Sequence, residues 1–254
     1  MLWYKAWLET RSRFLVGLAI LVGITIFIVV EYQTVARMLL SVPGMKVGGE
    51  LEQQILEQAE ISRTYRGYIW SQLFARNLPQ VWCLFAAVLG SGGLVSSGRS
   101  GGMVYTLSLP ISRRDLVVTR GALVAAELLA MALIPALLIP LLSLSVGESY
   151  SIGDALAHGV CIFAGGSVFF GLAFLLSSSF NDWRPVMFTV GVALALSALE
   201  DLFPWYADHG LFRVLSAAGY FRGSGLPWLG VVITLGATSA MVYGAALNVA
   251  RRDF

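Results

Sequence analysis

The chain has 254 residues, of which 57% are hydrophobic and 13% charged, with a formal net charge of +2 and a mean hydropathy of +0.76. Soluble domains carry about 25% charged residues, so this composition excludes a protein that covers itself with a polar surface in water. We therefore expect an all-α integral membrane protein, organised as a single transmembrane domain over residues 1–254.

The first predicted element is an amphipathic helix over residues 1–13 that lies in the membrane interface. Trp3 and Trp7 fall on one side of it at helical spacing, and tryptophans beside basic residues suit the headgroup layer. Glu9 precedes Arg13 by four residues, which is the favourable order for an ion pair along a helix.

Long runs of apolar residues with few or no charges predict six membrane spans. A helix needs roughly 20 apolar residues to cross a bilayer. The six runs cover residues 14–30, 78–97, 116–146, 157–180, 185–203 and 227–249. Between the first two, residues 31–77 are predicted to form an extracytoplasmic loop with a small helical cap.

The distribution of lysine and arginine predicts that both termini are cytoplasmic. One side of the predicted bundle carries ten basic residues, namely Lys5, Arg11, Arg13, Arg99, Arg113, Arg114, Arg120, Arg184, Arg251 and Arg252. The short connections on the opposite side hold only Arg213 and Arg222. The protein is therefore expected to be a multi-pass membrane protein.

Several catalytic motifs are absent from the sequence. No GxxxxGK[ST] loop occurs, so the chain is not expected to bind ATP through a P-loop of its own. The two histidines, His158 and His209, are 51 residues apart and form no HExxH motif. Cys83 and Cys161 lie inside apolar runs and indicate neither a disulfide framework nor a metal site. We therefore predict no catalytic residue, no metal and no cofactor held by this chain.

Glu127 interrupts the third apolar run, in the segment LVAAELLAMALIP. A carboxylate inside a membrane costs several kcal/mol unless it is paired or protonated. Two interpretations stay open. Glu127 is either an ionisable functional group that faces the bundle interior, or a structural group that bonds to a neighbouring span. The second is favoured.

The connection between the second and third spans, residues 98–115, is richer in features than a turn requires. Ser112 and Asp115 form a capping box directly before an apolar run, which predicts that a helix begins at about Arg113. The preceding segment MVYTLSL ends at Pro110 and carries apolar residues that have no lipid to bury in. Such a short helix suits a groove on a cytoplasmic partner.

At this point the sequence resembles a family. The stretch YTLSLPISRRDLVVTRG is similar to the corresponding connection of type-2 ABC transporter permeases, the membrane subunits of many bacterial ABC exporters. The matching residues are Thr106, Leu107, Leu109, Pro110, Ser112, Arg113 and Arg120. The interfacial helix, the six spans and the long first loop extend the resemblance over most of the chain. The chain departs from many relatives at residues 98–102, GRSGG, which lack a glutamate.

The resemblance implies that residues 98–115 are a coupling region that docks on a separate ABC ATP-binding subunit. Its coupling residues would be Arg99, Met103, Thr106, Leu107, Leu109, Pro110, Ser112, Arg113 and Arg114. It also implies a second permease copy, identical or similar, and ATP with Mg on the partner ATPase. We expect membrane lipid but no nucleic acid as a further partner, and the bacterial inner membrane as the location.

The expected function is therefore that of a permease subunit, which couples ATP hydrolysis by its partner to substrate export and is not itself an enzyme. The alternative is an ATP-independent secondary transporter or channel that uses Glu127 as its coupling carboxylate. The sequence does not identify the substrate.

Overall fold

The computed structural model describes residues 2–41, 60–91, 113–180, 182–203 and 210–251. Within these ranges the regular structure is helical throughout, which confirms the all-α prediction for the described part of the chain. The elements are α1 (Leu2–Ser41), α3 (Tyr65–Ile69), the π-helix η1 (Trp70–Asn77), α4 (Leu78–Ser91), α6 (Arg113–Ser143), the short 3₁₀ helix η3 (Leu144–Val146), α7 (Ile152–Ser177), α8 (Arg184–Leu202), α10 (Leu211–Leu215), α11 (Ala218–Phe221) and α12 (Trp228–Arg251).

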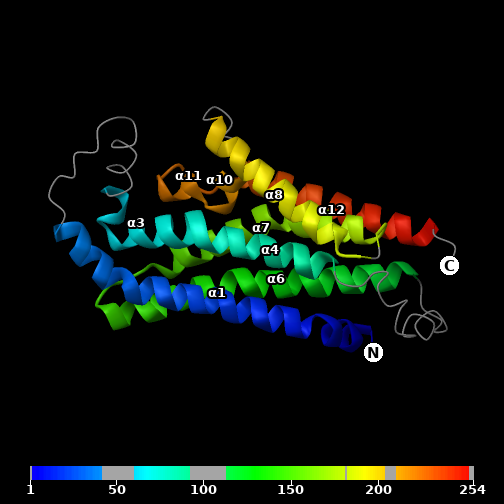
Figure 1. Cartoon of the computed structure of the whole chain (residues 1–254), viewed down its shortest axis with the longest axis horizontal. Coiled ribbons are helices and arrows are strands. Elements are labelled where there is room, and N and C mark those ends of the chain that lie inside the picture. The colour runs from blue at the N-terminus through cyan, green and yellow to red at the C-terminus, as the bar shows by residue number, and fades with distance from the viewer. Residues whose placement is uncertain (1, 42–59, 92–112, 181, 204–209, 252–254) are drawn as a thin grey trace.

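The long helices lie side by side and alternate in direction (Figure 1). The beginning of α1 and the end of α12 therefore lie at one end of the bundle, whereas α3, α10 and α11 lie at the other. Five helical segments of the described residues are long and apolar enough to cross a membrane. They are Leu2–Arg37, Tyr65–Ser91, Asp115–Val146, Ile152–Ser177 and Trp228–Arg251. A multi-pass membrane protein is the architecture that these helices fit.

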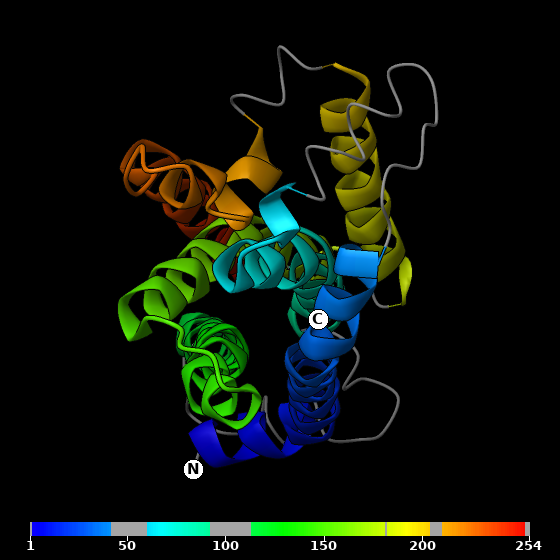
Figure 2. The same cartoon turned by 90° about the vertical axis from the view of Figure 1, so that its left-hand side faces the viewer.

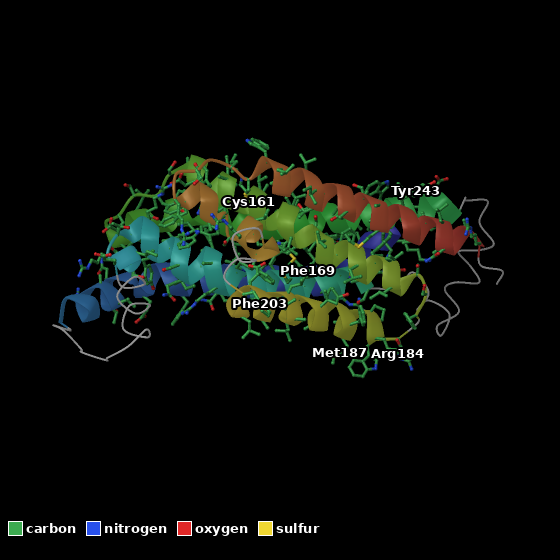
Figure 3. The ribbon with its side chains drawn as sticks, turned by 90° about the horizontal axis from the view of Figure 1, so that it is seen from above. Cys161, Phe169, Arg184, Met187, Phe203 and Tyr243 are labelled. Atoms are coloured by element: carbon green, nitrogen blue, oxygen red, sulfur yellow. The ribbon has the colours of Figure 1, made fainter. Side chains whose placement is uncertain are left out.

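Helix α8 is the remaining long helix. It runs from Arg184 and Met187 at one end to the neighbourhood of Phe203 at the other (Figure 3), and it packs against α4 and α7. Its 19 residues extend roughly 28 Å at about 1.5 Å per residue. It is not among the five segments above, so the sixth span stays a prediction.

Helix α7 occupies the centre of the packing, with α4, α6, α8, α10 and α12 as neighbours. Its approach to α4 depends on a glycine. A Cβ atom at Gly166 would lie 2.1 Å from Cζ3 of Trp82, whose side chain is fully buried. No larger residue fits there without moving the indole, because interiors are packed without spare volume.

Helix α1 is one continuous helix of 40 residues that covers both the predicted interfacial helix at 1–13 and the predicted span at 14–30. The segment contains no proline, and its first glycine, Gly17, is tolerated within the helix. The first turns of α1 nevertheless lie at an angle to the rest and reach beneath α6 (Figure 2).

The predicted loop at 31–77 is shorter than expected, since helices extend into it from both sides. Helix α1 continues to Ser41, and the second long helix begins at Tyr65 rather than at Leu78. Thr64 caps this second helix through its side-chain oxygen, which accepts a hydrogen bond from the Gly67 amide at 3.1 Å. The extension contains two arginines, Arg66 and Arg76, and therefore is not part of a charge-free run. The predicted cap falls mostly on residues 42–59, outside the described part.

Candidate functional site

Of the predicted coupling region, only residues 113–115 belong to the described part of the chain, where they begin α6. That helix begins at Arg113, with Asp115 in its first turn, as the capping-box pattern predicts. Arg113 and Arg114 are its first two residues. The other predicted coupling residues, Arg99, Met103, Thr106, Leu107, Leu109, Pro110 and Ser112, lie outside the described residues.

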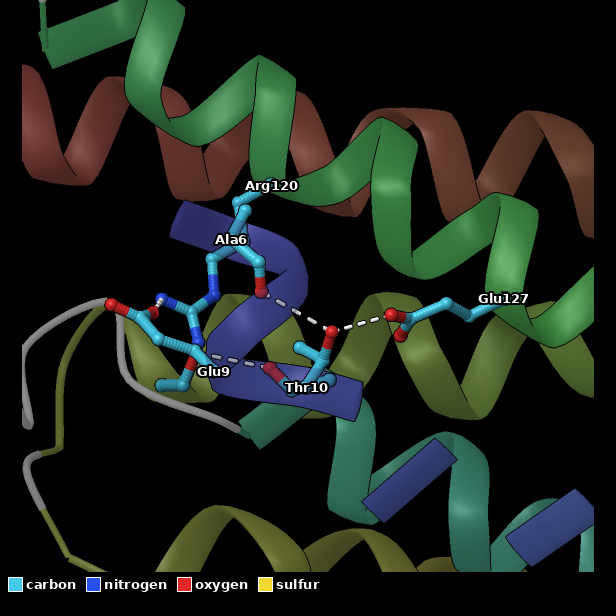
Figure 4. Close-up of polar contacts among 7 residues, drawn as sticks. Ala6, Glu9, Thr10, Arg120 and Glu127 are labelled. Carbon is cyan, nitrogen blue, oxygen red and sulfur yellow. Dashed lines mark hydrogen bonds and ion pairs between the residues drawn. The ribbon is translucent and has the colours of Figure 1, made fainter. Parts of the chain in front are cut away.

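Glu127 lies on α6, faces the first turns of α1 and is 4% exposed. Its partner is Thr10, whose side chain is also buried and whose hydroxyl donates a hydrogen bond to Oε1 of Glu127 (Figure 4). The Thr10 hydroxyl also lies 3.2 Å from the carbonyl oxygen of Ala6 in its own helix. The second carboxylate oxygen, Oε2, has no hydrogen-bond partner among the described residues.

A second polar pair lies beside the first. Nη1 of Arg120 is 2.9 Å from Oε2 of Glu9, with the two side chains 11% and 34% exposed. Glu9, which the spacing predicts to pair with Arg13, therefore has its ion pair with α6. Arg120 and Glu127 are seven residues apart, so they lie two turns apart on one face of α6. Two consecutive residues of α1 thus meet one face of α6.

This arrangement favours the structural interpretation of Glu127. A carboxylate removed from water costs free energy unless it is hydrogen-bonded or paired, and here a neighbouring helix supplies the donor. An ionised Glu127 accepts from Thr10. A protonated Glu127 donates to Thr10, whose hydroxyl then donates to the Ala6 carbonyl. Either form holds α1 against α6.

Close packing continues the contact between the helices further along α1. A Cβ atom at Gly17 would lie 2.6 Å from Cε of Met131 and 2.7 Å from Cδ1 of Phe85. These residues belong to α6 and α4, so three helices converge at this glycine. Sequence reasoning singled out neither Thr10 nor Gly17, because their partners are more than 60 residues away along the chain.

A second polar cluster lies at the other end of the bundle and holds α11 in place. Nε of Arg66 is 2.8 Å from Oδ2 of Asp154, and the Tyr220 hydroxyl donates to Oδ1 of the same carboxylate at 2.8 Å. This hydrogen bond raises the pKa of Tyr220. The rings of Trp70 and Phe221 stack with centroids 4.2 Å apart. Helix α11 is thereby held on η1 and α7.

Both clusters consist of hydrogen bonds and ion pairs between helices. The described residues contain no group of three or more histidine, cysteine, aspartate and glutamate side chains that could hold a metal ion. What the cluster of Glu9, Thr10, Arg120 and Glu127 can do is mechanical, since it binds the first turns of α1 to the helix that follows the predicted coupling region.

A scan against protein-family models finds no match for the chain, and searches among curated proteins and among solved structures find none either. The resemblance to type-2 ABC permeases therefore stays a prediction.

Proposed function

We propose that the chain is the permease subunit of an ATP-driven ABC exporter in a bacterial inner membrane, with both termini cytoplasmic. In this assembly α8 is the sixth span. Two copies of the chain, or this chain and a similar one, pair with two ABC ATP-binding subunits. Those partners bind ATP and Mg, whereas this chain moves the substrate and breaks no bond.

One observation carries the proposal. The element Leu109, Pro110, Ser112 leads in the sequence to Arg113, the first residue of α6. Helix α6 starts at the end of the bundle that also holds the beginning of α1 and the end of α12 (Figure 1). Eight basic residues of the described part lie at this end, which fits a cytoplasmic face. They are Lys5, Arg11, Arg13, Arg113, Arg114, Arg120, Arg184 and Arg251. The lack of a P-loop in the sequence fits a partner that supplies the ATPase.

The helix packing supports a route for force from such a partner. Helix α6 is continuous, so a push at Arg113 is carried to Glu127, 14 residues further on, which is roughly 21 Å along the axis. The pairs Glu9–Arg120 and Thr10–Glu127 make the first turns of α1 move with α6. Pro135 and Pro140 lie in the second half of α6, where they weaken its hydrogen bonding and permit bending. Closure of the ATPases would thus shift the bundle between two states.

The test is isolation of the tagged chain in detergent together with its partners. We expect a P-loop ATPase in stoichiometric amount with the natural sequence, and its loss from Leu109→Ala. The control is Leu144→Ala, because Leu144 is 73% exposed and lies at the opposite end of α6. Equal recovery of the ATPase with both variants, or transport by the chain alone in liposomes, would contradict the proposal.

The second candidate function is an ATP-independent secondary transporter or channel. The observation that favours it is the buried Oε2 of Glu127, which lacks a partner among the described residues, since intramembrane carboxylates often serve as coupling groups. In that case Glu127→Gln abolishes transport by the isolated chain in liposomes. Under the proposed function, the isolated chain transports nothing with either residue.

A further inference from the structure

A polar pocket of about 430 Å³ opens between η1, α8 and the α10–α11 pair. Helices α10 and α11, which contribute to its lining, lie at the end of the bundle away from the beginning of α1 and the end of α12 (Figure 1). Three arginines line it from three segments: Arg76 in η1, Arg213 in α10, and Arg222 directly after α11. Trp70 and Phe212 contribute aromatic walls.

The described lining of the pocket carries more basic than acidic side chains. Among the described lining residues, Arg76, Arg213 and Arg222 lie beside one carboxylate, that of Glu200. The Glu200 side chain is engaged in local structure, since its Oε1 accepts a hydrogen bond from the Phe212 amide at 2.9 Å in the first turn of α10. A carboxylate is stabilised at that position by the unsatisfied amides of a helix start.

Two of these arginines lie in a short connection between helices. Arg213 and Arg222 are the only basic residues in the short connections on the side that the charge distribution predicts to be external. Membrane proteins keep arginine away from short external connections, and yet both of these line one pocket together with Arg76. The convergence indicates a binding role for an anion.

An apolar groove continues from this pocket toward the middle of the bundle. It has a volume of about 200 Å³, lies between α4 and α8, and is lined by Leu84 and Leu194 among others. Gln80, Ser197 and Phe212 line both hollows, so the polar pocket and the groove adjoin. The leucines are 44% and 67% exposed, which places apolar side chains where bilayer chains run.

We propose that the pocket and the groove together form one binding site for an anionic amphiphile. A phosphate or carboxylate head lies among Arg76, Arg213 and Arg222, where guanidinium groups bind oxyanions through charge-assisted hydrogen bonds. The hydrocarbon chain lies along the groove between α4 and α8. A phospholipid of the bilayer and a transported amphiphile share this chemistry. The site does not depend on an ATPase partner.

The first experiment measures lipid binding to the full-length protein in detergent by native mass spectrometry. Dioleoylphosphatidylglycerol and dioleoylphosphatidylcholine have the same chains and differ in net charge. We expect the anionic lipid to bind roughly fivefold tighter, and Arg76→Gln and Arg222→Gln each to weaken it roughly threefold. The control is Arg184→Gln, an exposed arginine at the other end of α8 that pairs with Asp182. Equal affinity for the two lipids, or equal losses in all three variants, would overturn the proposal.

The second experiment tests the groove and the source of the ligand. Leu194→Trp fills the groove and should lower affinity for phosphatidylglycerol, whereas Leu229→Trp, at a 76% exposed position on α12, should not. If the two variants behave alike, the groove has no part in binding.

Lipid extracted from purified protein identifies the source of the ligand. About one anionic phospholipid per chain, lost in Arg76→Gln, indicates a bilayer lipid. Saturable binding of added lipid with none co-purified indicates an exchangeable amphiphile.

Discussion

The hydrogen bond between Thr10 and Glu127 can be tested by replacing Thr10 with valine, which has the same shape and no hydroxyl. This substitution leaves both oxygens of a 4% exposed carboxylate without a partner among the described residues. Hydrogen bonds to charged groups contribute about 1.5–3 kcal/mol, and a buried group that loses its partner costs a similar amount. We therefore expect Thr10→Val to lower the free energy of unfolding by about 2 kcal/mol.

Thr25 provides a matched control within the same helix. It is fully buried and its hydroxyl bonds only to the Leu21 carbonyl four residues earlier, at 2.9 Å, among the described residues. Thr25→Val should lower the free energy of unfolding by only about 0.5 kcal/mol, because the Leu21 carbonyl keeps its helical hydrogen bond. In thermal unfolding of the purified protein, Thr10→Val should therefore melt about 5 °C below Thr25→Val.

A double-mutant cycle shows whether the cost arises at Glu127. In a Glu127→Leu background there is no buried carboxylate to leave unpaired, so Thr10→Val should cost no more than Thr25→Val does. Melting temperatures of the four proteins give the coupling energy. If Thr10→Val costs the same with glutamate and with leucine at position 127, the reasoning about this contact is wrong.

Two further predictions concern the packing and the outer cluster. Gly166→Ala should destabilise the fold by about 1–3 kcal/mol because the added methyl overlaps Trp82, whereas Gly236→Ala, with nothing within 4 Å of the added Cβ, should be neutral or stabilising in chemical unfolding. Tyr220 has its pKa raised from 10.0 by its hydrogen bond to Asp154, so its stabilising effect is present below about pH 10 and is lost as the pH rises further. In melting curves recorded over a pH series, Tyr220→Phe should therefore lose less melting temperature above about pH 10 than the natural sequence does. An equal slope of melting temperature against pH in both proteins would contradict this.

Local patterns in the sequence were sufficient for the helical class and for parts of the boundaries. The start of α6 at Arg113 agrees with the capping-box pattern of Ser112 and Asp115, which is local because it concerns residues three apart. The apolar runs coincide with helices of the structure. The second span, however, was predicted to begin at Leu78, whereas its helix begins at Tyr65, because arginine side chains do not end a helix.

Local patterns in the sequence do not predict which residues of distant segments contact each other. Glu127 stands out as a buried carboxylate, yet nothing near it in the sequence identifies Thr10, 117 residues away, as its partner. In the same way, the i,i+4 rule paired Glu9 with Arg13, whereas the tertiary fold brings Arg120 to it. A long-range ion pair depends on which faces of two helices meet, and that choice follows from packing.

The sequence by itself determined that this protein is helical, that its helices suit a membrane, and where its basic residues concentrate, because hydrophobicity and charge act residue by residue. Only the tertiary structure decided that α1 is one helix fastened to α6, and that Arg76, Arg213 and Arg222 line one pocket. These arginines are up to 146 residues apart. Their convergence follows from the packing of η1, α8 and the α10–α11 pair, which no single segment encodes.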